Sequence, residues 1–353
     1  MADSPRPRAF QPSNLLWKQL AHAATPCAFR AANAAQASQW QHRTRQALDA
    51  LVGFQDLQRV PLRPRRIETV DRGDFIREKV ILQTTQGLAM PVYILKPKEA
   101  TGRLPVALAF HGHGYGVKDI VGLWEDGSER ITAQGYHSDF AVQLCRRGFL
   151  VAAPEIVCFG ERQSDFARLA RQRSPVPGTC QHSAMLALHM GKSILGLKMF
   201  EGKRLVDYLE TRPDADTTRL GAMGISGGGT HCFFSTCLDT RIKACVVSGY
   251  FCSFRESILD MHHCACNYVP GMHQFGEMHD LAGLIAPRPM LIESASHDYI
   301  FPRSAVRKGV ARAREVYRRF GVRDGIETDY FEGRHQISGA RAYDFLAEKL
   351  ALP

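Results

Sequence analysis

The feature that most constrains the fold of this 353-residue chain is an alternation that begins after Pro105. Short, mostly apolar runs bounded by turn residues alternate there with helical stretches. The runs are Val106–Phe110, Phe149–Ala153, Leu220–Met223, Ala244–Val247, Met290–Glu293 and Glu327–Phe331. Short buried strands interleaved with amphipathic helices, the clearest at 304–320, predict a mostly parallel, doubly wound α/β sheet. In such a sheet, functional residues gather where the strands end at their carboxyl edge.

The first part of the chain has a helical pattern. Residues 13–53 are predicted to be helical, and Gly53 follows as a stop signal. One face of this segment carries residues at spacings of three and four: Ala37, Trp40, Thr44, Ala47, Leu48 and Leu51. Pro61 and Pro64 then end the helical structure. We expect this flank to pack on the core or on a second subunit, so a homo-oligomer stays open as an alternative.

Three strand-like segments follow, at 66–71, 75–84 and 88–96. Short turns that contain Gly or Asp separate them, which predicts an antiparallel meander. We therefore divide the chain into an N-terminal helical extension, residues 1–65, and a larger α/β domain, residues 66–353.

Composition excludes several classes of protein. The chain is 45% hydrophobic and 23% charged, which rules out wholesale disorder. No run approaches the ~20 apolar residues of a membrane span, and the start of the chain, Met1 to Arg8, lacks the apolar region of an export signal. Ten cysteines in this context predict reduced thiols. We expect a cytoplasmic protein that does not bind membranes.

The net charge of +10 is concentrated near the start of the chain. Residues 1–66 hold ten Lys or Arg and three Asp, and so carry +7 of the total. Such a basic region can meet nucleic acid or an acidic surface. Because no nucleic-acid-binding motif accompanies the charge, we interpret it as a solvated basic face and expect no nucleic-acid partner.

A Gly-x-Ser-x-Gly motif lies between a predicted strand and a predicted helix. Leu220–Met223 leads into Gly224-Ile225-Ser226-Gly227-Gly228, and Thr230–Leu238 is the expected helix. A serine at the apex of a sharp strand-to-helix turn adopts a strained backbone, and neighbours without Cβ let that turn close. The turn exposes the serine hydroxyl, which makes Ser226 the candidate nucleophile.

A serine hydroxyl needs an adjacent base, itself oriented by an acid. Asp298 lies in the loop after Met290–Glu293, and His335 lies in the loop after Glu327–Phe331. The order Ser, Asp, His is the one expected of this kind of sheet. We assign His335 as general base and then acid, and Asp298 as the group that fixes the imidazole tautomer.

The loop after Val106–Phe110 reads His111-Gly112-His113-Gly114-Tyr115-Gly116. Its glycines let backbone approach a tetrahedral oxygen, and a second oxyanion donor is expected from this loop. We predict an oxyanion hole made by the amides of His113 and Gly227, while His111 holds the loop.

With these motifs in place, the sequence resembles the α/β-hydrolase superfamily, in the bacterial branch related to dienelactone hydrolases and acetyl xylan esterases. The likeness spans about residues 40–350 and includes Phe159-Gly160-Glu161-Arg162, Asn267-Tyr268-Val269-Pro270-Gly271 and the run from Asp280 to Pro289. The resemblance implies a central, mostly parallel eight-stranded sheet in residues 66–353, and ester hydrolysis through an acyl-enzyme without metal or organic cofactor. Dienelactone hydrolases use a cysteine nucleophile, whereas position 226 is serine, which favours ordinary oxyesters.

The connection 250–283 is unusually rich in His, Cys, Met and aromatic residues. A metal interpretation would use His262, His263, Cys264 and Cys266, but Cys-x-Cys with adjoining His matches structural zinc spacing poorly. We expect this segment instead to cover the carboxyl edge of the sheet and to offer apolar surface to an acyl or alcohol group.

Two further pairs of residues have less definite roles. Glu161 and Arg162 follow a strand end and either reach the pocket or form a structural ion pair. Cys180 and His182 are interpreted as packing residues at a helix entry.

The sequence thus predicts a serine esterase acting on a short-acyl or small-molecule ester. An acyltransferase, an amidase or a carbon–carbon hydrolase would use the same three residues. A non-catalytic basic binding protein is the alternative from another class, and the complete Ser/Asp/His set argues against it.

Overall fold

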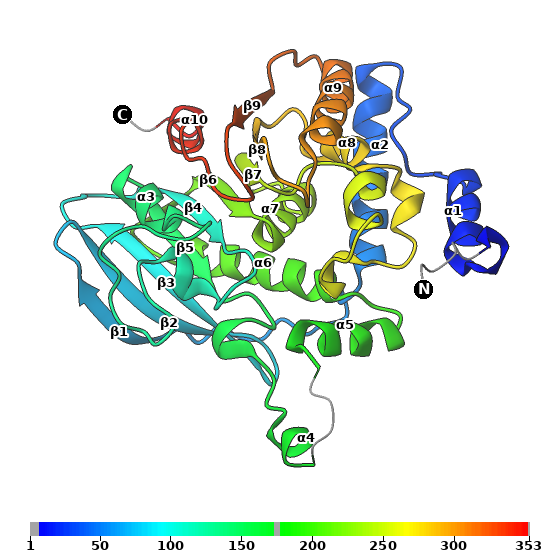
Figure 1. The fold of residues 1–353 in the computed structure, drawn as a ribbon. Helices are drawn as coiled ribbons and strands as arrows, with labels where there is room; N and C mark the ends of the chain where they lie inside the picture. The colour runs from blue at the N-terminus through cyan, green and yellow to red at the C-terminus, as the bar shows by residue number, and fades with distance from the viewer. Residues whose placement is uncertain (1–6, 173–176, 352–353) are drawn as a thin grey trace.

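A single nine-stranded sheet organises the protein in the computed structural model, which describes residues 7–172 and 177–351 (Figure 1). Its strands are β1 (Arg65–Asp71), β2 (Phe75–Thr85), β3 (Leu88–Pro97), β4 (Leu104–Phe110), β5 (Leu150–Pro154), β6 (Ala215–Ile225), β7 (Ala244–Ser248), β8 (Met290–Ala295) and β9 (Ile326–Phe331). Their order across the sheet is β1-β2-β3-β5-β4-β6-β7-β8-β9.

The sheet is antiparallel at one end and parallel over the rest. β1, β2 and β3 form an antiparallel meander, and β3 pairs antiparallel with β5. Every later pairing, from β5 through β4 and β6 to β9, is parallel. The meander and the doubly wound region are therefore confirmed. The eight strands implied by the resemblance were one too few, because the largely exposed β1 adds to the free edge of β2.

Helices cover both faces of the sheet. They are α1 (Pro12–His22), α2 (Ala34–Val52), α3 (Phe140–Arg146), α4 (Ala167–Arg171), α5 (Thr179–His189), α6 (Ile194–Glu210), α7 (Gly227–Leu238), α8 (Met278–Leu281), α9 (Arg303–Arg319) and α10 (Ala342–Lys349). One core cluster joins the sheet to α2, α6, α7 and α9, and the other joins it to α3 and α10. The result is a three-layer sandwich with apolar side chains on both faces of the sheet.

The N-terminal flank differs from the expected continuous helix 13–53. It is split into α1 and α2 by a connection that contains Pro26, whose ring removes a helical amide donor. Asn33 begins α2, since its side chain accepts a hydrogen bond from the Gln36 amide at 3.0 Å. Residues 1–6 of the predicted extension lie outside the described residues.

The two helices of the flank are buried to different extents. Trp40, Leu48 and Val52 of α2 are buried in the same core cluster as α7, whereas α1 contributes no buried residue. Figure 1 shows α1 in blue at the right, away from the sheet. α2 is thus part of the main core, and α1 is a peripheral helix.

Within the described ranges, no helix combines the length and apolar character that crossing a bilayer requires. The cytoplasmic location stays a prediction.

Candidate active site

Ser226 lies at a strained turn between β6 and α7. Its φ of 58° and ψ of −121° fall in a region that residues with a Cβ rarely adopt, at a cost of about 1–3 kcal/mol. Its amide donates to Ser248 O of β7 at 3.1 Å, and its carbonyl accepts from the Thr230 amide at 2.9 Å. Backbone bonds on both sides therefore hold the strained conformation, and the residue is partly exposed at the carboxyl edge of the sheet.

The glycines around Ser226 are required by close backbone contacts. A Cβ on Gly224 would lie 2.2 Å from Gly228 O, and a Cβ on Gly228 would lie 1.9 Å from Phe110 O. Both distances are far below van der Waals contact. The glycines of the motif thus let β6, α7 and the end of β4 approach closely enough to form the turn.

His335 and Asp298 are joined by a hydrogen bond of 2.7 Å between Nδ1 and Oδ2. The other carboxylate oxygen of Asp298 accepts the amides of Ile300 and Phe301 at 3.0 and 3.1 Å. Because a carboxylate only accepts, the His335 proton lies on Nδ1 and leaves Nε2 as the acceptor. Asp298 is buried and held at both oxygens, so the orientation of the imidazole is fixed.

The His335 ring packs near two aromatic rings. Its centroid is 5.7 Å from that of Tyr136 and 5.7 Å from that of Phe301, with interplanar angles of 27° and 23°. Nε2 is buried and makes no hydrogen bond to any described residue. Ser226 and His335 line the same cavity, but no direct hydrogen bond joins them in this structure. Such contacts are commonly loose without substrate.

In the loop after β4, the amide of His113 donates to no protein atom among the described residues. His111 Nδ1 donates to Gly112 O at 2.8 Å. That carbonyl belongs to the same trans peptide unit as the His113 N–H, which therefore points in the opposite direction. His111 also accepts the Ile156 amide at 3.0 Å through Nε2. As expected from the sequence, His111 holds the loop.

A second histidine, not foreseen from the sequence, accepts a hydrogen bond from the neighbouring amide. Gly112 N donates to His137 Nε2 at 2.8 Å, and His137 Nδ1 donates to Asp119 Oδ2 at 2.8 Å. Burial lowers the pKa of His137, which suits a neutral ring that accepts this bond. Among the described residues, the amides of His113 and Gly227 donate to no protein atom. Both amides are therefore available to a ligand.

A cavity of about 420 Å³ brings the predicted residues together. Ser226, Gly227, His113 and His335 line it, and so do His262, His263, Cys264 and Asn267 of the 250–283 segment. The segment therefore does reach the site. The wall it contributes is more polar than expected, because its Tyr268 and Met272 line an adjoining cavity of about 930 Å³ instead.

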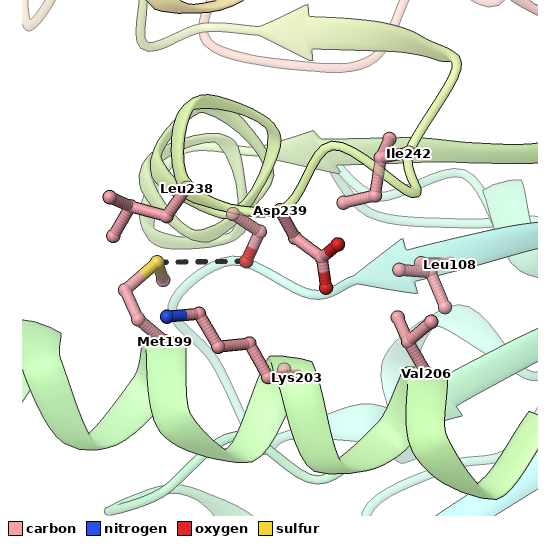
Figure 2. Close-up of a pocket in the computed structure, with 9 residues that line it drawn as sticks. Leu108, Met199, Lys203, Val206, Leu238, Asp239 and Ile242 are labelled. Carbon is pink, nitrogen blue, oxygen red and sulfur yellow. Dashed lines mark hydrogen bonds between the residues drawn. The ribbon is translucent and has the colours of Figure 1, made fainter. Parts of the chain in front are cut away.

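A separate crevice between α6 and α7 is not a ligand site (Figure 2). Figure 2 shows Met199 and Lys203 of α6 facing Leu238 and Asp239 at the end of α7. The crevice has no room for a water molecule. Leu238 ends the helix that Ser226 precedes, so the crevice is remote from the predicted site.

The residues after β5 form ion pairs. Arg162 makes two hydrogen bonds of 2.7 Å to Glu201 of α6, with both side chains nearly buried. Glu161 pairs with Lys79 at 2.6 Å. Of the two roles the sequence left open, the structure shows the ion pair for both residues, and neither lines the cavity at Ser226.

The sheet order and the serine turn between a strand and a helix are those of an α/β-hydrolase. The chain belongs to the Abhydrolase family, whose model matches residues 12–307. That match includes Ser226 and Asp298 and ends before His335.

Individual relatives are more distant. A Bacillus subtilis (strain 168) protein named "Putative hydrolase YtaP" is 29% identical over 275 residues, which are 74% of this chain and 84% of the relative. Among solved structures, a "putative acetyl xylan esterase" from Bacteroides fragilis NCTC 9343 aligns with a TM-score of 0.75 at 16% identity, over 93% of this chain and 84% of its own. A glucuronoyl esterase from Solibacter usitatus aligns with a TM-score of 0.66 at 17% identity, over 93% and 97% of the two chains. At these identities the structures show a shared fold.

A second buried carboxyl, not foreseen as part of this region, lies within β8. Glu293 Oε1 accepts the Gly339 amide at 2.9 Å, while Oε2 is buried without a hydrogen-bond partner among the described residues. Burial raises the pKa of Glu293 to about 7. The folded protein therefore keeps this proton at pH values where the unfolded chain has lost it.

The raised pKa of Glu293 predicts how the stability of the protein depends on pH. Between the ordinary pKa of a glutamate and about 7, the folded state binds more protons, so the contribution of Glu293 to stability falls as pH rises. Glu293→Gln removes this dependence and keeps an acceptor for Gly339. From pH 5 to pH 8, we expect the variant to gain up to about 3 kcal/mol of unfolding free energy relative to wild type. Urea unfolding at both pH values measures this, and a pH-independent difference would contradict it.

The glycine contacts give a second prediction. Gly228→Ala forces a Cβ against Phe110 O. We expect the variant to lose about 1–3 kcal/mol of unfolding free energy and to lose the turn at Ser226. Gly178→Ala is the control, since a Cβ there meets no atom within 4 Å. Thermal unfolding of the two variants compares them. Equal melting temperatures would show that the close contact is not required.

Proposed function

We propose that this protein is a serine hydrolase that cleaves a carboxylic ester through an acyl-enzyme. The observation that supports it best is the convergence at one cavity of Ser226, an imidazole with a free Nε2, and two free amides. These groups are a nucleophile, its base and an oxyanion hole. Asp298 completes the set by holding the proton of His335 on Nδ1.

The first half of the reaction forms the acyl-enzyme. Ser226 Oγ attacks the ester carbonyl as His335 Nε2 takes its proton, and the carbonyl oxygen becomes an oxyanion between the amides of His113 and Gly227. Each such donor is worth roughly 3–4 kcal/mol of barrier. The intermediate collapses when His335 gives its proton to the departing alkoxide, and the alcohol leaves.

Water completes the cycle. His335 removes a proton from water, whose oxygen attacks the acyl carbon, and the second oxyanion occupies the same two amides. Collapse returns the proton to Ser226 Oγ and releases the carboxylic acid. Asp298 stays ionised throughout and stabilises the imidazolium that forms twice.

The size of the cavity supports a small substrate. About 420 Å³ is at the lower end of small-molecule sites, which fits a short acyl group or a compact ester. Membership of the Abhydrolase family and the esterases among the structural neighbours favour an ester over an amide.

Replacing the nucleophile tests the proposal. With p-nitrophenyl acetate, Ser226→Ala should lower kcat/KM by roughly three orders of magnitude or more, because no group replaces the attacking oxygen. Ser235→Ala is the matched control: it lies on the same helix, and its hydroxyl contacts Met199 Sδ at 3.6 Å, away from the cavity. It should retain activity. Undiminished turnover by Ser226→Ala with a wild-type melting temperature would refute the assignment.

The same three residues would serve acyl transfer, amide cleavage or carbon–carbon hydrolysis. Product analysis with a competing alcohol separates transfer from hydrolysis, since a transferase yields mainly the new ester. Our proposal requires the free acid as the main product.

A further inference from the structure

Three metal-binding donors meet beside the loop that carries the His113 amide, and a fourth thiol lies next to one of them. A ring nitrogen of His113 and the sulfurs of Cys264 and Cys266 each lie within 4.8 Å of the other two. Cys180 Sγ lies 3.0 Å from Cys264 Sγ. The four residues come from three segments far apart in sequence: the loop after β4, α5, and the short helix η5 (Ala265–Asn267) with its preceding residue. Their convergence is thus a product of the fold.

One of these donors is buried without a hydrogen-bond partner among the described residues, and a second is fully buried. His113 Nε2 is buried and makes no hydrogen bond to a described residue. Cys266 is fully buried. Leaving a buried polar atom unpaired costs about 1–3 kcal/mol. A bound cation would satisfy the imidazole and the sulfurs at once.

The charge around the cluster suits a divalent cation. Three thiolates, one neutral imidazole and a divalent ion carry a net charge of −1. Lys198 of α6 is 1% exposed, and its charge interacts with Cys266, Cys180 and Cys264. The buried ammonium of Lys198 would balance the remaining negative charge. The site would in turn give this lysine the negative partner that a buried charge requires.

We propose that Cys264, Cys266 and His113 bind one zinc ion, with Cys180 as the fourth ligand once its sulfur moves away from that of Cys264. Three cysteines and one histidine are a common tetrahedral set for structural zinc, and thiolate ligands disfavour magnesium and calcium. Binding releases the thiol protons to solvent. With four protein ligands the ion has no open position, so it activates no water, and its role is to hold the fold.

The ion would fix the loop after β4, which carries the His113 amide, to the 250–283 segment. The His113 ring already lies against the serine turn, since a Cβ on Gly227 would be 3.0 Å from its Cε1. It also contacts Phe159 edge-on, at 5.2 Å between centroids. The zinc proposal does not depend on the proposed function, because the ion can be measured without a substrate.

This donor set differs from the one considered from the sequence. His262 and His263 do not belong to it, and His263 Nε2 instead lies 3.3 Å from Ser257 Oγ. The competing use of the same thiols is a disulfide between Cys180 and Cys264.

Metal analysis of the full chain, purified without a histidine tag under reducing conditions, tests the proposal. We expect about one zinc per chain by inductively coupled plasma mass spectrometry. Cys266→Ala and His113→Ala should each lower zinc content by about tenfold or more. Cys145→Ala, which removes an equally buried thiol from the other core cluster, should leave it unchanged.

Cobalt substitution keeps the test valid if the variants fail to fold. Wild-type protein reconstituted with Co²⁺ should show thiolate-to-cobalt charge-transfer absorption and the intense visible bands of a tetrahedral site. Protein without stoichiometric zinc and without those bands would overturn the proposal. So would zinc that survives Cys266→Ala, or a Cys180–Cys264 disulfide found by peptide mapping of protein handled without reductant or metal chelator.

Discussion

The backbone contact between Gly228 and Phe110 is the constraint on which the rest of the site depends. It brings the start of α7 against the end of β4, and it is possible because no Cβ intervenes at 1.9 Å. The strained φ of Ser226 persists because β7 and Thr230 hold its peptide groups from both sides. The strain thus has a structural source, and it exposes the hydroxyl at the edge of the sheet.

Parallel pairing then assembles the remaining groups. β4, β6, β8 and β9 run in the same direction, so the loops that follow them open on one edge. Each side chain is further fixed by its own bonds: Asp298 by two amides, His335 by Asp298 and two aromatic rings, and the His113 peptide unit by His111. We attribute the proposed activity to this preorganisation, which costs nothing when charge develops.

The sequence predicted what local patterns encode. The strand positions, the place of the Gly-x-Ser-x-Gly turn and the hydrogen-bonded pair of Asp298 and His335 follow from apolar runs and from residues just beyond them. It missed groups that reach the site through tertiary contacts: Tyr136 and Phe301 against His335, and His137 on Gly112. Cys264 and Cys266 were considered as metal ligands from the sequence, but His113 and Cys180 beside them were missed, because no fixed spacing marks residues that only folding brings together.

The most direct test of the central claim, that Ser226 is the nucleophile, is covalent labelling with a fluorophosphonate. Its phosphorus forms a bond to an activated serine oxygen and releases fluoride, so the label reports nucleophilicity without any assumption about the natural ester. Our account predicts one adduct per chain, located by peptide mapping on Ser226 and formed far more slowly in His335→Ala. An adduct on another residue, or protein that hydrolyses esters while Ser226 remains unlabelled, would contradict it.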